Sequence, residues 1–421
     1  MLLGWLQLDA TQTCRITSVD EQEIQMRQVL AIVGTRSEMV RLAPVIRRLR
    51  DEGGRAVGVR WIHAGNPTRQ VWQTGAVFGL SPDGEVLPDH SPANLLEHSW
   101  ALTNAISKEM ESRPPELLIV QGESLPAMLA AQQAFMRRLP VIYLTAPSYN
   151  GIRELKGPQN SYRKLLNAIS AFQCVATEYD LTQLRERGVP AFEIGVTGDT
   201  VVDAIDTVTR HGALNGSKSN SVSTDGRAIT RILVPLGPAS RWIGSLTDFA
   251  LAIADLAQSA SALEFTIVVE PDASCRDLLT AILGSSPNVV LREAIPYPEF
   301  LRLMQQQDYV LTDSLDYYDE AVALGKPTLL AQAPISSQDL SPLTGLTFIG
   351  ERREQIVRGV LASRASNESA GRRYPLASPL GDGHAAARIS RLVMNWSRNQ
   401  ILTARAFEPF RPQRSSDQLS Y

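Results

Sequence analysis

Short, wholly apolar runs alternate with amphipathic segments along almost the whole chain, and this alternation limits the possible folds more than any other feature. Val29–Gly34 is an apolar run that ends in glycine, and apolar positions with helical spacing follow it at residues 37–53. A strand, a turn and a helix in that order form one half of a βαβ unit. Because the expected strands are apolar throughout, the pattern predicts parallel sheets that helices cover on both faces.

A stretch rich in serine, glycine and asparagine separates two such series. Residues 211–230 contain almost no large apolar side chain, which is typical of a flexible linker. A chain of 421 residues is also long for one hydrophobic core. We therefore predict two doubly wound, Rossmann-like α/β domains at 29–210 and 231–396, with an extension at 1–28 and a tail at 397–421. Ligands of such sheets bind beyond the carboxyl ends of the strands, so an interdomain cleft is the expected site.

Composition excludes several classes of function. A hydrophobic content of 44% with 20% charged residues indicates a globular protein. The formal net charge of −3 provides no broad attraction to nucleic acid or to an acidic membrane, and no apolar run approaches the roughly 18 residues of a membrane span. The three cysteines form no CxxC pair and the five histidines form no HxxxH or HExxH pair, so we expect no metal site, no cofactor and a cytoplasmic location.

Four segments then point to a family. They are VGTRSEMVRLAPVIRRL, GVTGDTVVDAI, LTDSLDYYDEAVALGKP and SPLGDGHAAARI. These segments resemble motifs of the non-hydrolysing UDP-N-acetylglucosamine 2-epimerases, and the similarity extends from about Val29 to Trp396. The resemblance implies a fold like that of the glycosyltransferase-B enzymes, an isomerase-type reaction on a UDP-N-acetylhexosamine, UDP or a UDP-sugar as ligand, and a homodimer.

The family reaction needs a group that removes the C2 proton of the sugar, an acid, and cations that hold the diphosphate. The resemblance places Glu123 at the acid/base position and keeps Arg163 as a second candidate catalytic residue. It assigns the nucleotide or sugar to Arg36, Glu38, Arg41, Arg241, Phe300, Ser314 and Asp319. For residues 34–38 an alternative stays open, because Ser37 or Glu38 could simply cap a helix. Phe300 is equally compatible with an ordinary core position.

Other positions depart from the family pattern. Carboxylates of the family correspond to uncharged residues within Thr145–Tyr149 and to Gln159 and Asn160, and a glycine pair corresponds to Leu315 and Asp316. We expect Leu315 and the two tyrosines behind it to fill the space that the glycines would leave.

Three functional hypotheses therefore remain. The chain is an enzyme acting on a UDP-N-acetylhexosamine, or a non-catalytic binding or assembly subunit in a polysaccharide or glycoconjugate pathway. The third hypothesis is a changed reaction with Glu123 or Glu154 as base.

Overall fold

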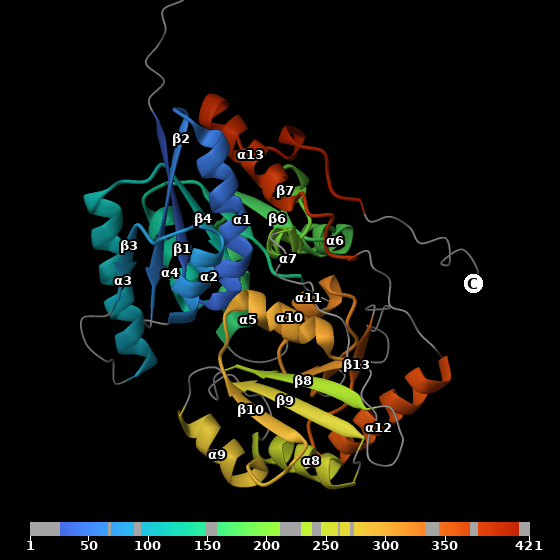
Figure 1. Ribbon diagram of the computed structural model, residues 1–421. Coiled ribbons are helices and arrows are strands. Elements are labelled where there is room, and N and C mark those ends of the chain that lie inside the picture. Colours follow the sequence, from blue (N-terminus) through green and yellow to red (C-terminus); the bar gives the residue numbers. More distant parts are fainter. Residues whose placement is uncertain are drawn as a thin grey trace, which may run out of the picture.

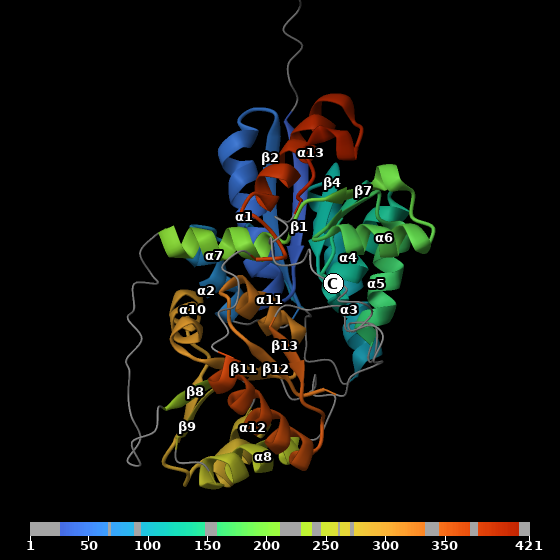
Figure 2. The same cartoon turned by 90° about the vertical axis from the view of Figure 1, so that its right-hand side faces the viewer.

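The computed structural model contains two parallel sheets, one above the other in Figure 1, and Figure 2 shows the same arrangement from the side. The residues that it describes are 26–65, 69–87, 94–147, 158–210, 229–237, 246–259, 262–269, 273–332, 345–370 and 378–411. Arg241, Glu154 and most of the predicted extension and linker lie outside the described residues. No helix in the described ranges combines the length and the apolar composition that crossing a bilayer requires.

The first sheet has seven strands in the order β3-β2-β1-β4-β5-β6-β7, all paired in parallel. Its strands are β1 (Arg27–Val33), β2 (Val57–Ala64), β3 (Gly84–Val86), β4 (Leu117–Gln121), β5 (Val141–Leu144), β6 (Phe172–Val175) and β7 (Ile194–Val196). The helices of this part are α1 (Arg36–Gly53), α2 (Arg69–Val77), α3 (Leu95–Ser112), α4 (Leu125–Met136), α5 (Pro158–Ile169), α6 (Glu178–Glu186) and α7 (Thr200–Arg210), with the 3₁₀ turn η2 (Ala191–Glu193).

The second sheet has six strands in the order β10-β9-β8-β11-β12-β13, also parallel. Its strands are β8 (Thr230–Leu236), β9 (Leu263–Val269), β10 (Val289–Glu293), β11 (Tyr309–Thr312), β12 (Thr328–Leu330) and β13 (Leu346–Phe348). The helices are α8 (Leu246–Ser259), α9 (Ala273–Leu283), α10 (Tyr297–Gln306), α11 (Leu315–Ala323), α12 (Arg353–Ala370) and α13 (Ala385–Asn399), with the 3₁₀ turn η4 (Ala404–Ala406). The predicted α/β class with two doubly wound parallel sheets is confirmed.

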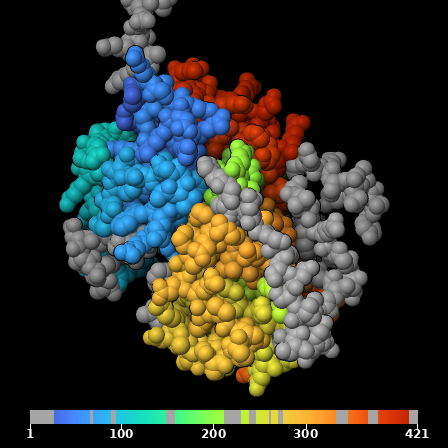
Figure 3. All heavy atoms as spheres, in the orientation of Figure 1, coloured from blue at the N-terminus to red at the C-terminus, as the bar shows by residue number. Residues whose placement is uncertain are grey.

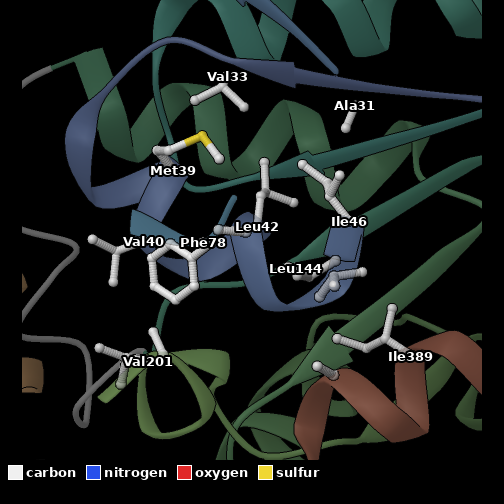
Figure 4. Packing of buried hydrophobic residues seen from close by; sticks show 14 of the residues in the cluster. Ala31, Val33, Met39, Val40, Leu42, Ile46, Phe78, Leu144, Val201 and Ile389 are labelled. Atoms are coloured by element: carbon white, nitrogen blue, oxygen red, sulfur yellow. The ribbon is translucent and has the colours of Figure 1, made fainter. Parts of the chain in front are cut away.

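Helix α1 illustrates how the sequence positions the site. Thr35 is its N-cap, and Thr35 and Glu38 form a reciprocal capping box, so the helix starts immediately after β1. Its apolar face is completely buried, and Met39 and Ile46 lie beside Val33 and Ala31 of β1 (Figure 4). The first turn of α1 is therefore fixed at the carboxyl edge of the first sheet.

The last helix returns to the first sheet. Helix α13 packs against α1 and α7, and Figure 1 shows it beside α1. Its N-terminal amides at Ala385 and Ala386 donate to the Asp203 carboxylate of α7, at 3.2 and 2.9 Å. The predicted range 231–396 groups α13 with the second sheet by chain order, whereas its packing partners belong to the first.

The two sheets meet through apolar side chains. Helix α2 packs against α10 and α7 packs against α11, and Figure 3 shows the α2 and α10 regions in direct contact. The largest hydrophobic cluster continues from α1 into Phe300, Met304 and Tyr317 of the second half. Interdomain surfaces that move freely are usually more polar, so this apolar contact favours a closed arrangement.

Candidate functional site

Glu38 acts within its own helix turn. Its carboxylate accepts the backbone N–H of Gly34 at 2.6 Å and that of Thr35 at 3.2 Å. Its side chain also lies against Gly122, where an added Cβ would come within 3.2 Å of it. The structure thus places Glu38 between the turns that follow β1 and β4, and the capping role proposed as the alternative for residues 34–38 is present.

Arg36 reaches from the first sheet to the second. Its guanidinium donates to both carboxylate oxygens of Glu320, at 3.1 and 3.2 Å. The same group lies over the rings of Phe300, Tyr297 and Tyr317, at 4.9, 5.2 and 5.7 Å from their centroids. A guanidinium that lies over aromatic faces is attracted electrostatically by the ring quadrupoles. This attraction is strongest when the group is shielded from water. Phe300 therefore contacts a predicted site residue and belongs to the core at the same time.

Arg41 forms a second bridge between the two halves. It donates through Nε to Asp199 at 3.2 Å and through Nη2 to Asp319 on α11, and Nη1 donates to Ser37 at 2.6 Å. The side chains of Arg41, Asp199 and Asp319 are all at most 3% exposed. The structure brings the predicted residues Arg41 and Asp319 together as partners of each other.

Glu123 and Arg163 form the third ion pair. The carboxylate follows β4, Arg163 lies on α5, and their N–O distances are 2.6 and 2.7 Å. The Nη1 atom of Arg163 is buried and has no hydrogen-bond partner among the described residues. A buried donor without a partner has a free-energy cost that a ligand acceptor would remove. Because the turn of Glu123 adjoins Gly122 and hence Glu38, this pair lies next to the start of α1.

The start of α11 is filled with side chains. Ser314 is the N-cap and accepts the N–H of Asp316 at 3.3 Å. Leu315 and Tyr318 belong to a small buried cluster with Leu380. Leu315 and Tyr318 are thus buried, while the filling of the space that the glycines would leave stays a prediction.

Asp199 was not among the predicted site residues. It lies after β7 in the segment GVTGDTVVDAI, one of the four segments that carry the family resemblance, and that membership was the available signal. Beside it lies a cavity of about 10 Å³, lined by Arg41, Gln121 and Thr197 among others, with room for a single water molecule. The buried Oε1 of Gln121 has no hydrogen-bond partner within the part of the chain that the structure describes. In the described ranges, no group of His, Cys, Asp and Glu could hold a metal ion.

Comparison with known proteins identifies the family of this chain. The family model for UDP-N-acetylglucosamine 2-epimerase matches residues 59–394. The chain belongs to this family. The probable UDP-N-acetylglucosamine 2-epimerase of Ralstonia nicotianae is 24% identical over 385 residues, which cover 87% of this chain and 99% of that protein. The UDP-N-acetylglucosamine 2-epimerase of Escherichia coli K12 is 23% identical over 376 residues, with coverages of 87% and 98%.

Solved structures of epimerases show the same fold. The Neisseria meningitidis enzyme bound to UDP-GlcNAc superimposes with a TM-score of 0.77 at 21% identity, covering 87% of this chain and 100% of that one. The Methanocaldococcus jannaschii enzyme in complex with UDP-GlcNAc and UDP gives a TM-score of 0.72 at 20% identity, with coverages of 87% and 99%. At these identities the similarity establishes the fold of this epimerase-family chain.

Proposed function

We propose that this epimerase-family chain binds a UDP-N-acetylhexosamine between its two sheets and carries out isomerase-type chemistry on it, with Glu123 as the acid/base. The observation that carries the proposal is spatial convergence. Arg36, Arg41, Phe300 and Asp319 come from distant parts of the chain and meet where the carboxyl edge of the first sheet faces α10 and α11. Two relatives of the same fold were solved with UDP-GlcNAc bound.

Each group has a chemically suitable task in this proposal. Arg36 and Arg41 neutralise the diphosphate, Phe300 supports the uracil ring and Asp319 accepts hydrogen bonds from the ribose. Glu123 removes the C2 proton, and Arg163 orients its carboxylate while the buried Nη1 donates to the sugar. Binding of this kind requires the two arginines to exchange their present carboxylate partners for phosphate oxygens.

A second candidate is a non-catalytic binding or assembly subunit of a polysaccharide or glycoconjugate pathway. The observation in its favour is that Arg36, Arg41 and Arg163 each already face a carboxylate of the same chain. Asp316 at the start of α11 adds a negative charge near the expected diphosphate. We further propose a cytoplasmic homodimer for either candidate.

The test combines titration calorimetry and proton NMR. We expect UDP and UDP-GlcNAc to bind, and the C2 proton of UDP-GlcNAc to exchange for deuterium in heavy water. Glu123→Gln should lower turnover by about 10²- to 10⁴-fold, because a single proton-transfer group commonly contributes that much. The matched control is Glu116→Gln, since Glu116 precedes the same strand and pairs with Arg27 on the surface.

The outcomes separate the candidates. Binding without exchange at C2 would replace the enzyme proposal by the non-catalytic subunit. Absence of binding for both ligands would overturn the enzyme proposal and leave the non-catalytic assembly subunit. Equal loss of turnover in the two variants would show that Glu123 has no special role.

A further inference from the structure

One feature of α10 and α11 resembles a receptor for a cation. The rings of Tyr297, Phe300 and Tyr317 and the carboxylate of Glu320 surround a single position, and the guanidinium of Arg36 occupies it. Aromatic faces together with a carboxylate are the chemistry that recognises a planar cation. We call these four side chains of the second domain the α10–α11 socket.

The contact is well shielded from water. The side chain of Arg36 is 12% exposed and that of Glu320 is 2% exposed, and the two residues are 284 positions apart in the chain. A charge pair in such a place is stable only with good geometry, and here two parallel hydrogen bonds of 3.1 and 3.2 Å provide it. Any separation of the two sheets must therefore break this pair.

We propose that Arg36 in the α10–α11 socket is a built-in latch. It holds the two domains closed and prevents the planar ring of a ligand from stacking on Phe300. The guanidinium of Arg36 and a nucleobase would both stack on the ring face of Phe300 inside the socket. Only one of them can therefore occupy that face at a time. Release of Arg36 opens the socket and at the same time frees a cation for a phosphate. The latch itself needs no ligand, whereas its competition with a nucleotide rests on the proposed function.

The decisive variant is Glu320→Gln, which keeps the shape of the side chain and Arg36 but removes the charge. Hydrogen–deuterium exchange followed by mass spectrometry reports local opening. We expect the peptides covering residues 34–41 and 315–323 to exchange several-fold faster in this variant than in the wild type. Arg36→Lys should act in the same direction, because lysine keeps the charge but lacks the planar fork and the stacking surface.

The matched control is Asp255→Asn. Asp255 receives two hydrogen bonds of 2.6 Å from Arg353, which is the same two-pronged geometry within one domain. Exchange of the two peptides should not change in this control. Circular dichroism and thermal melting establish that each variant is folded before its exchange is compared.

Titration with UDP then tests the competition. If the closed form must open before the nucleotide binds, the apparent affinity of the wild type equals the affinity of the open form multiplied by the fraction of molecules that is open. Because that fraction is small, the apparent affinity is low. We expect Glu320→Gln to bind UDP about 5- to 150-fold more tightly, the usual range for coupling between two states. A loss of affinity would mean that Glu320 holds the nucleotide, and it would overturn the competition.

The two proposals fail in different ways. Unchanged exchange in both folded variants, Glu320→Gln and Arg36→Lys, overturns the latch whatever UDP does. Faster exchange without UDP binding in any variant supports the latch and contradicts the proposed function.

Discussion

The ring of Phe407 occupies the space next to Gly195 on the edge strand β7. A Cβ added to Gly195 would lie 2.5 Å from Cζ of Phe407 and 3.0 Å from Cζ of Phe172. Three residues later, the N–H of Phe410 donates to the carbonyl of Val196 at 2.8 Å. The segment after η4 thus covers an edge strand that would otherwise expose unpaired backbone groups.

Replacement of Gly195 by alanine should therefore destabilise the protein. Overpacking of this kind costs about 1–3 kcal/mol, and each kcal/mol corresponds to about 2–4 °C in a domain of this size. The measurement is the melting temperature. Gly84→Ala on the opposite edge strand is the control, because its nearest neighbour would be an ordinary contact at 3.8 Å. Equal melting temperatures of the two variants would contradict the account.

Much of the fold was predictable from the sequence because the strands are apolar on both faces and the helices are amphipathic. Strands β3 and β7 were not predicted, because each has only three residues and one of them is a glycine, a residue that is depleted in strands. Helix α3 was not predicted either, since Leu96 and Trp100 place large apolar side chains on its exposed face. Such irregularities blur the helical period.

For the site, the sequence identified individual residues but not their pairing. It assigned Arg41 and Asp319 separately to a nucleotide, and the structure joins them although they are 278 positions apart. Glu123 and Arg163 were also predicted as site residues, and their mutual contact depends on how β4 and α5 pack. Long-range pairing of this kind follows from tertiary packing, which a local pattern does not encode.

Arg41 neutralises two buried carboxylates, so its replacement should strongly lower the free energy of unfolding. Arg41→Met would remove the cation that Asp199 and Asp319 share, and loss of one partner from a buried ion pair costs about 3–5 kcal/mol. Asp319→Asn should cost clearly less, because Arg41 keeps Asp199 and Ser37 as partners. Thermal unfolding of both variants at the same pH compares them. An equal or larger loss in Asp319→Asn would show that the pair with Asp319 dominates.

Asp203 should make stability depend on pH. Burial raises the pKa of its carboxyl to about 7 in the folded protein, against the opposing effect of the Ala386 and Ala385 amides. Between pH 4 and 7 the folded chain therefore holds a proton that the unfolded chain releases. Since stability falls with rising pH wherever the folded state binds more protons, this group contributes a decrease of up to about 4 kcal/mol across that window.

The difference in free energy of unfolding between wild type and Asp203→Asn isolates this contribution. We expect the difference to shift in favour of the wild type as the pH is lowered from 7 to 4. Asp382→Asn should show the opposite pH dependence, because the hydrogen bond from Arg388 holds the pKa of Asp382 below its ordinary value. The stability that the ionised Asp382 contributes should be lost as the pH falls below 4. A flat difference for Asp203→Asn would contradict the burial argument.

The proposed homodimer has a candidate contact on α3. Leu96 and Trp100 lie one helical turn apart and are 81% and 69% exposed. Exposed tryptophans in apolar surroundings are common at the centre of protein interfaces. Trp100→Ser should therefore shift the sedimentation coefficient from dimer to monomer, while folding is unaffected because the side chain is outside the core. Phe192→Ser is the matched control, since Phe192 is 68% exposed on η2, which packs against β7, whereas α3 packs against β3 at the opposite edge of the sheet. A wild-type monomer would refute the homodimer, and a dimer that survives Trp100→Ser would place the interface elsewhere.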